Sequence, residues 1–230
     1  MSSAPLLMLS SMATREILKE LAGGHTRSSG QAVDAQAAGG VDVAKRVRAG
    51  EAVDVVVLAA NVIDDLLAEG HLAGKRVDLV RSGVGIAIPS GRPRPDISSE
   101  TAVRDAVMAA GSLSFSTGPS GNYLQGLFAR WGIADAVRDR IVIPPPGTPV
   151  GRFVAEGRAD LGFQQLSELI NVAGIEVLGP LPAAIQTMTV FSAAVAAKSR
   201  DVPAADALIA ALASPATGEV KRRFGMEPFT

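Results

Sequence analysis

The sequence contains no cysteine, few aromatic residues and almost no net charge. Without cysteine the chain has no disulfide, no thiolate metal ligand and no cysteine nucleophile. Lysine and arginine number 22 against 23 aspartates and glutamates, which is not the basic balance of a nucleic-acid-binding protein. Aromatic residues make up 4% of the chain, too few for a base-stacking platform. We therefore expect no nucleic-acid partner.

Long apolar runs are also missing. No stretch of about 18 apolar residues is present, so we expect no membrane insertion. Residues 1–11, MSSAPLLMLSS, lack the basic n-region of a signal peptide. The sequence therefore predicts a cytoplasmic protein, or a periplasmic one if an N-terminal signal has been removed.

Several motifs of catalytic and cofactor-binding proteins are absent as well. There is no phosphate-binding loop, and Gly83 and Gly85 form only a GxG, short of a dinucleotide fingerprint. No GxSxG turn is present, so a serine-hydrolase triad is not expected. His25 and His71 lie far apart, without metal-ligand spacing. We expect neither a cofactor nor a metal, and no catalytic residue is assigned.

Apolar runs and helical patterns alternate along the first 80 residues. Residues 53–59 are β-branched and apolar enough to form a strand covered on both faces. The other expected strands are 6–10, 32–36 and 77–80, and the expected helices are 12–21 (ended by Gly23-Gly24), 41–49 and 61–67. This βαβαβαβ order predicts a parallel sheet with helices on both faces.

The rest of the chain predicts a second α/β unit, followed by a strand that crosses back to the first unit. Its expected strands are 83–88, 112–115, 141–143, 160–164 and 175–178, and its expected helices begin at Ser98 or Ser99, at Tyr123 and at Thr148. Residues 188–197 are expected to form a strand that crosses back, followed by helices at 204–212 and 215–224.

Residues 115–123, FSTGPSGNY, combine a strand end, a Gly/Pro turn and a helix start. The first N–H groups of a helix lack intrahelical partners and attract anions. Gly118 and Gly121 let a ligand approach the backbone closely. The stretch predicts an anion site that includes Thr117, Ser120, Gly121 and Asn122. The alternative is an ordinary helix start with Ser120 as its N-cap.

In open α/β sheets, ligands bind outside the carboxyl ends of the strands. The residues that follow the expected strands are small, polar and mostly uncharged, which suits a compact anion held by N–H and hydroxyl groups. Besides the 117–122 turn they are Ser10, Ser11, Gly39, Gly40, Arg81, Gly147 in the 146–148 turn, Gln164 and Gln165. Arg81 either grips a carboxylate with its guanidinium or is an ordinary surface arginine.

The order and spacing of several segments resemble the molybdate-binding-protein-like branch of the type II periplasmic binding proteins. The segments are 6–11, 43–54 (VAKRVRAGEAVD), 119–123 (PSGNY), 154–162 (VAEGRADLG) and 212–225, and they span essentially the whole chain. The resemblance implies two Rossmann-like α/β lobes joined by two crossover strands, with an anion in the cleft between them. Lobe 1 would comprise residues 1–84 and 187–230, and lobe 2 residues 85–186.

The resemblance also implies roles for single residues. Ser10 or Ser11 corresponds to the first-loop serine, and Ser120 and Gly147 correspond to main-chain donors. Gly40 takes the place of a second-loop serine, and Gln165 that of a tyrosine of molybdate binders. Together with Arg81, these departures favour a small di- or tricarboxylate over molybdate.

Residues 160–169 and 174–182 look more like a subgroup that includes bacterial aconitate isomerase. We therefore expect a solute-binding-type protein for a small anion, with an isomerase of an unsaturated tricarboxylate as the alternative. Such an isomerase needs a base within reach of the carbon acid, and the sequence offers no evident one. An ABC permease would be a partner only if the protein is exported.

Overall fold

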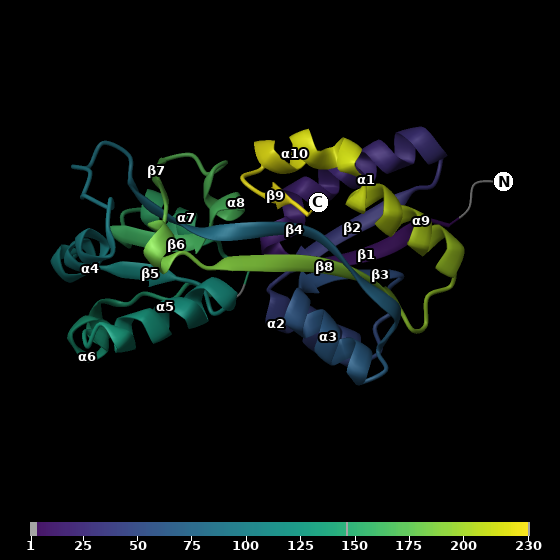
Figure 1. Ribbon diagram of the computed structural model, residues 1–230, viewed down its shortest axis with the longest axis horizontal. Helices are drawn as coiled ribbons and strands as arrows, with labels where there is room; N and C mark the ends of the chain where they lie inside the picture. Colours follow the sequence, from purple (N-terminus) through teal and green to yellow (C-terminus); the bar gives the residue numbers. More distant parts are fainter. Residues whose placement is uncertain (1–3, 146, 230) are drawn as a thin grey trace. The chain divides into compact units, whose positions relative to one another are not determined.

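A computed structural model describes residues 4–145 and 147–229, so Pro146 of the predicted 146–148 turn and residues 1–3 lie outside the described part. The chain forms two compact units (Figure 1), Met1–Arg81 with Val190–Thr230 and Ser82–Thr189. It passes between them twice, inside strands β4 (Leu72–Pro89) and β8 (Met188–Ala196). Two α/β units joined by two crossover strands confirm the predicted fold class.

The first unit contains a mixed sheet with strand order β2 (Val33–Ala38), β1 (Leu6–Ser11), β3 (Val55–Ala59), β8 and β4. β1 is parallel to both β2 and β3. β8 is antiparallel to β3, and the short β9 (Glu227–Pro228) is antiparallel to β4. The expectation of an all-parallel sheet was wrong because the return strand, distant in sequence, lies between β3 and β4.

Helices cover both faces of this sheet (Figure 1). Strand β3 shows why, because Val55 and Val57 enter one buried cluster while Val56 and Leu58 enter another. The first cluster includes side chains of α1 (Arg15–Ser29) and α9 (Val202–Ala213), and the second those of α2 (Gly40–Arg48) and α3 (Ala60–Ala68). The remaining helical segments are η1 (Met12–Thr14), η4 (Pro215–Thr217) and α10 (Gly218–Arg223).

In the second unit β5 (Leu113–Phe115) is parallel to β6 (Leu161–Gln165), while β4 is antiparallel to β6 and β7 (Ile175–Pro180). Phe128 of α5 (Pro119–Arg130) packs edge-on against Phe115 and Phe163, with ring centroids 6.0 and 6.5 Å away. The other helical segments are α4 (Glu100–Ala109), α6 (Ala134–Val137), η2 (Arg138–Arg140), α7 (Val150–Ala155), α8 (Leu166–Leu169) and η3 (Ala183–Ile185).

Strand β4 is continuous where two shorter strands, 77–80 and 83–88, were expected. At Gly83 a Cβ would lie only 2.9 Å from Gln186 Nε2, so the glycine makes room for that side chain. The Gln186 amide accepts from the Val84 N–H at 2.9 Å and donates to the Val84 carbonyl at 3.0 Å. The Gln186 side chain therefore makes the two backbone hydrogen bonds to Val84 that a neighbouring strand would otherwise make.

Helix α1 runs through Gly23-Gly24 and His25, where the sequence predicted a helix end and a loop. Two interior glycines cost about 1 kcal/mol each relative to alanine. Burial of Ile17, Leu18 and Ala22 on the sheet outweighs that cost. The helix ends at Gly30 (φ 77°), whose N–H bonds to the Thr26 carbonyl.

The strand expected at 141–143 is reduced to one bridge, between Leu113 and Ile141. Pro144 and Pro145 follow directly. Since proline has no N–H to donate, it cannot extend a ladder.

Candidate functional site

Three of the helices that follow the carboxyl ends of strands begin at an N-cap residue that cannot cap them with its side chain. Their N-cap residues are Gly39 for α2, Ala59 for α3 and Gly118 for α5. None of these residues carries a side-chain oxygen. Because the first N–H groups of a helix have no intrahelical partner, these three starts present open donors and partial positive charge.

Helices α4 and α9, which do not follow a strand of the described chain directly, begin differently. Ser99 accepts a hydrogen bond from the Ala102 N–H at 3.1 Å, and Asp201 accepts one from the Ala204 N–H at 3.0 Å. Side-chain caps are also missing at α1, α6, α8 and α10, and the starts of α2, α3 and α5 combine a missing cap with an N-cap residue after a strand that has no side-chain oxygen. At the ends of β2, β3 and β5 a ligand can supply the missing acceptor.

In the first unit, the carboxyl ends of β1 and β2 lie side by side, with Ser11 opposite Ala38. A Cβ added at Gly40 would lie 3.9 Å from Cβ of Ser11, so positions 11 and 40 face each other at this edge. Ser11 is 7% exposed, and its hydroxyl lies 3.5 Å from that of Thr14. The structure therefore brings the predicted residues Ser11, Gly39 and Gly40 together.

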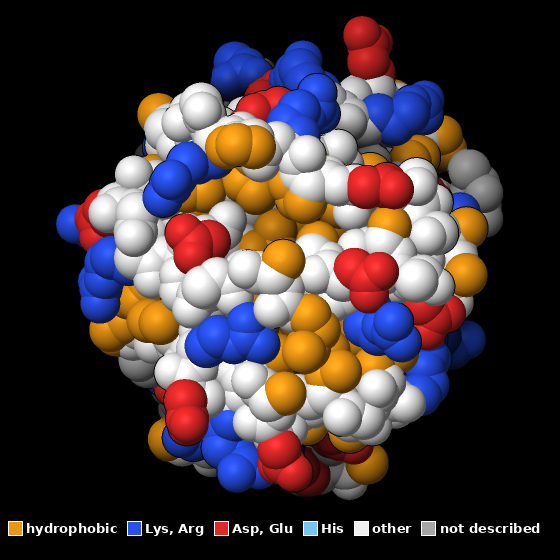
Figure 2. All heavy atoms as spheres, turned by 90° about the vertical axis from the view of Figure 1, so that its left-hand side faces the viewer, with side chains coloured by type: hydrophobic (Ala, Val, Ile, Leu, Met, Phe, Trp, Pro, Cys, Tyr) orange, Lys and Arg blue, Asp and Glu red, His pale blue; other side chains and the backbone are white. Residues whose placement is uncertain are grey.

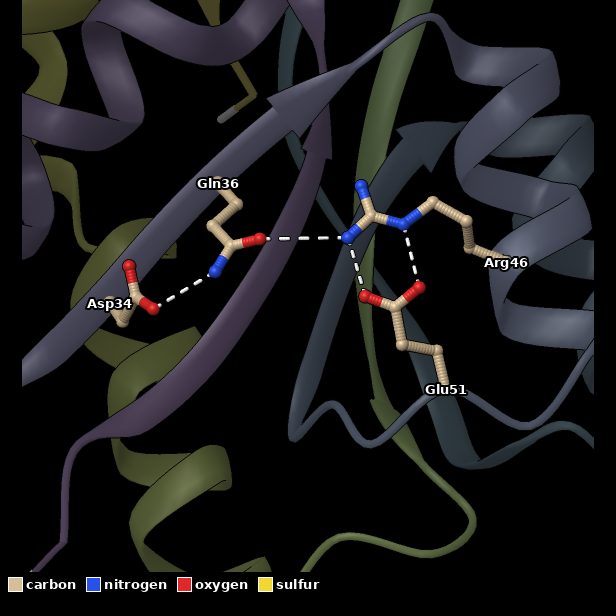
Figure 3. Close-up of polar contacts among 4 residues, drawn as sticks. All are labelled: Asp34, Gln36, Arg46 and Glu51. Atoms are coloured by element: carbon tan, nitrogen blue, oxygen red, sulfur yellow. Dashed lines mark hydrogen bonds and ion pairs between the residues drawn. The ribbon is translucent and has the colours of Figure 1, made fainter.

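Ser10 is placed differently, because its hydroxyl donates to the Gln36 carbonyl of β2 at 3.3 Å. Figure 3 shows the side chains around Gln36: its amide donates to Asp34 and accepts from Arg46, which is paired with Glu51. The Arg46 guanidinium lowers the pKa of the Glu51 carboxyl by its hydrogen bond. The cluster of two carboxylates, one amide and one guanidinium links β2 to α2.

In the second unit, the start of α5 matches the predicted turn with one correction. Gly118, not Ser120, is the N-cap, because Pro119 takes the first helical position. Ser120 is 1% exposed. The Asn122 N–H already bonds to the Gly118 carbonyl, so the open N–H groups are those of Ser120 and Gly121.

Gly121 has to be a glycine. A Cβ there would lie 1.6 Å from the Ser116 carbonyl oxygen, closer than any contact allows. The first turn of α5 therefore rests directly on the end of β5. Thr117 and Asn122 are exposed at the same turn.

Gln164 and Gln165, both buried, end β6 with side chains on opposite faces of the sheet. Gln164 accepts from the Val150 N–H of α7 at 2.9 Å and donates to Glu168 at 2.7 Å. Gln165 donates to Thr189 at 2.8 Å, and its Oε1 has no partner in the described chain. The sequence does not single out Thr189, which lies in the expected apolar strand 188–197.

Gly147 lies in an exposed turn with φ 80° ahead of α7. The first N–H of α7, that of Val150, is already bonded to Gln164. Arg81 is half exposed and its Nε donates to Glu227 of β9 at 2.6 Å. A ligand carboxylate at Arg81 would bind the remaining N–H groups of the guanidinium beside Glu227 or replace Glu227 at Nε.

Charges elsewhere on the second unit are mostly paired. Examples are Arg130 with Glu100 at 2.7 Å and Arg152 with Glu156 at 2.6 Å, and in Figure 2 basic and acidic side chains are interspersed. Within the described ranges no group of three or more histidines and acidic residues could hold a metal ion, and no helix is long and apolar enough to cross a membrane.

Residues 6–227 match the family model described as bacterial extracellular solute-binding protein. An aconitate isomerase from Pseudomonas sp is 35% identical over 97% of this chain and 87% of its own. The molybdate-binding protein ModA of Azotobacter vinelandii is 31% identical, over 47% of this chain and 44% of its own.

Solved structures agree on the fold. The periplasmic molybdate-binding protein of Azotobacter vinelandii superposes with a TM-score of 0.81 at 19% identity, covering 98% of this chain and all of its own. The tungstate-binding protein TupA of Desulfovibrio alaskensis G20 gives 0.70 at 18% identity, covering 99% of this chain and all of its own. The chain belongs to the bacterial extracellular solute-binding proteins and has the molybdate-binding-protein-like type II fold.

Proposed function

We propose that this protein binds a small anion through open backbone N–H groups and neutral side-chain donors. The uncapped starts of α2, α3 and α5, each placed after a strand, carry the proposal. Helix starts of this kind stabilise negative charge without a bound counter-ion. The membership of a solute-binding family supports the same function.

The ligand we propose is a small di- or tricarboxylate rather than molybdate. Gly40 contributes no hydroxyl opposite Ser11, although a Cβ there would make only ordinary contacts, with neighbours at 3.8 and 3.9 Å. A tetrahedral oxyanion profits from donors on every side, whereas a planar carboxylate suits a guanidinium such as that of Arg81. The relative that covers most of this chain also acts, by its name, on a tricarboxylate.

A thermal-shift panel of molybdate, tungstate, sulfate, citrate and cis- and trans-aconitate tests the proposal. At a hundredfold excess over Kd, a ligand adds about 2.7 kcal/mol to the free energy of unfolding. For a chain of this size that raises Tm by about 5–10 °C. We expect the largest shift with a tricarboxylate, and no shift with any anion would refute binding.

A second candidate is the isomerisation of aconitate, which the 35% identical aconitate isomerase favours. In the reaction, a base removes the allylic proton from the methylene carbon, the double bond moves, and a proton returns to the other end of the allyl system. Ultraviolet absorbance of cis-aconitate mixed with the protein measures it. Conversion to the trans isomer at a rate proportional to protein concentration would establish the enzyme, and an unchanged spectrum would leave binding alone.

The compartment and the partner follow from which of these functions holds. A solute-binding protein that is exported would deliver its ligand to an ABC permease, while an isomerase needs no permease. Separate assays of cytoplasmic and periplasmic fractions of the source cell, probed with an antibody to the chain, distinguish the two.

A further inference from the structure

We propose that two copies of this chain associate through the free edge of strand β2, so that the sheets of their first units join into one. β2 is the outermost strand of its sheet, because β1 pairs with one side of it and no described strand pairs with the other. Such an edge presents unpaired N–H and C=O groups to which another strand can bind. The association is independent of the proposed anion binding.

The backbone groups at the free edge belong to alternate residues of β2. The Leu6 N–H of β1 bonds to the Ala32 carbonyl at 2.9 Å, and the register between the two strands is unbroken along β2. In a parallel ladder every second residue directs both its backbone groups to the same neighbour. The even-numbered residues therefore face β1, and the N–H and C=O groups of Val33, Ala35 and Ala37 face the free edge.

This edge lacks the usual protection against pairing. Natural proteins protect strand edges with proline, lysine or a bulge, and residues 33–38 contain none of these. The last strand at the other end of the sheet order, β5, is only three residues long. Its Leu113 carbonyl accepts from the Val142 N–H at 2.7 Å, and prolines follow at 144 and 145. The edge of β2 is longer, regular and open.

The space beside this edge is a groove between α1 and β2. The strand contributes Val33, Ala35 and Ala37 to the lining, and the helix contributes residues that include Lys19 and Gly23. The three strand side chains are short, and Gly23 has no side chain to fill the groove. An added strand can therefore approach β2 to the usual spacing of paired strands, about 4.8 Å.

A second copy of β2 fits this edge when the two strands run antiparallel about a two-fold axis. With Ala35 opposite Ala35 of the second copy, Val33 lies opposite its Ala37, and all the outward backbone groups are paired. Each of these opposite pairs exchanges two hydrogen bonds. The neighbouring registers leave either Val33 or Ala37 without a partner, so the centred register is the best one.

The side chains on the other face of β2 are complementary in the same register. Asp34 lies opposite Gln36 of the second copy, at a position where cross-strand side chains are close. Both residues are exposed. Gln36 Nε2 donates one hydrogen to Asp34 of its own chain at 2.9 Å (Figure 3), and its other hydrogen can bond to Asp34 of the second copy. The register that places Asp34 opposite Asp34 is disfavoured by like charge.

The charges along the groove favour a second copy over a peptide of one charge sign. Arg15, Glu16 and Lys19 line it, and Arg15 Nε donates to Glu16 at 2.7 Å. A groove with both signs offers little excess charge to an acidic or a basic segment, whereas a second copy brings the same mixed set. The edge and the groove are thus both self-complementary.

Sedimentation velocity of the purified chain, from micromolar to submillimolar concentration, tests the proposal with Ala35→Pro. Proline removes the central N–H of the interface and leaves the bonds from the even-numbered residues to β1 in place. Wild type should dimerise reversibly, and the variant should raise the dimer dissociation constant at least about tenfold while its circular dichroism spectrum stays that of wild type. Ala35→Val, which keeps the N–H, is the matched control and should dimerise as wild type does.

A charge exchange tests the register and serves if the proline variant does not fold. Gln36→Glu places a carboxylate opposite Asp34 of the second copy and should weaken the dimer roughly fivefold. Adding Asp34→Asn to it sets an amide opposite a carboxylate again and should return the dissociation constant to within about twofold of wild type. A wild type that stays monomeric over the whole range refutes the proposal, and a dimer that neither Ala35→Pro nor Gln36→Glu weakens refutes this edge as its interface.

Discussion

Lys221 of α10 is a buried lysine, 1% exposed, with no ion pair or hydrogen bond of its ammonium to any described residue. Burial lowers the pKa of its side chain from the ordinary value of about 10.5. The residue before it in α10, Val220, packs against the buried cluster that contains Met226. Burying the charged ammonium lowers the free energy of unfolding, and a substitution that removes the charge removes this cost.

Replacing Lys221 by methionine should stabilise the protein at neutral pH by about 1–3 kcal/mol. Since the folded pKa is lowered, the unfolded chain binds more protons between that value and 10.5, so wild-type stability rises with pH there. The variant lacks this rise. Chemical denaturation from pH 7 to 10.5 measures it, with the exposed Lys19→Met as control. Parallel pH profiles of wild type and Lys221→Met would contradict the account.

Arg81 and Glu227 offer a second test, of the proposed guanidinium contact. Arg81→Ala should weaken trans-aconitate binding by about 1.5 kcal/mol, the low end for a charged hydrogen bond because the residue is half exposed. Arg81→Lys should restore part of the loss. Glu227→Gln should strengthen binding, since it removes the carboxylate that competes for the guanidinium. If all three variants bind as wild type does, Arg81 is a surface residue.

At the scale of elements, a carboxylate in the first turn of helix α5 should have opposite effects on the stability of the helix and on anion binding. Asn122 is exposed in the first turn, where a carboxylate interacts favourably with the helix dipole. Asn122→Asp should therefore raise Tm slightly and weaken anion binding by about 0.5–1 kcal/mol. Asn122→Ser is the neutral control. Thermal unfolding and calorimetry on both variants measure the two effects, and equal affinities would remove α5 from the site.

The ends of helices depend on packing against distant parts of the chain, which the local sequence does not show. Gly23-Gly24 is a reasonable helix end, but the apolar face of α1 continues past it and Gly30 has the left-handed conformation that ends the helix. Ser120 looked like an N-cap, and Pro119 shifted the helix start two residues earlier. The local sequence predicted both helices but misplaced their ends. Tertiary contacts determine which of several nearby residues ends a helix.

For the whole molecule, the order of apolar strands and helices, together with the family resemblance, was enough to predict two α/β units and their crossover strands. The position of β8 between β3 and β4 could not be read from residues 1–80, because it depends on a segment more than a hundred residues away. The turns at strand ends were predictable from their small polar residues. The open amide of Gln165 was not, since it depends on Thr189 and on the absence of a second partner.

The central claim is that an anion binds at the uncapped helix starts, and amide NMR during a titration with trans-aconitate tests it most directly. We predict saturable shifts of N–H signals at uncapped helix starts, those of Ser120 and Gly121 in α5 or that of Val41 in α2. The N–H signals of Ala102 and Ala204, which are bonded to Ser99 and Asp201, should stay in place. Shifts confined to other residues, or saturable binding that leaves all three uncapped amides unmoved, would contradict the account.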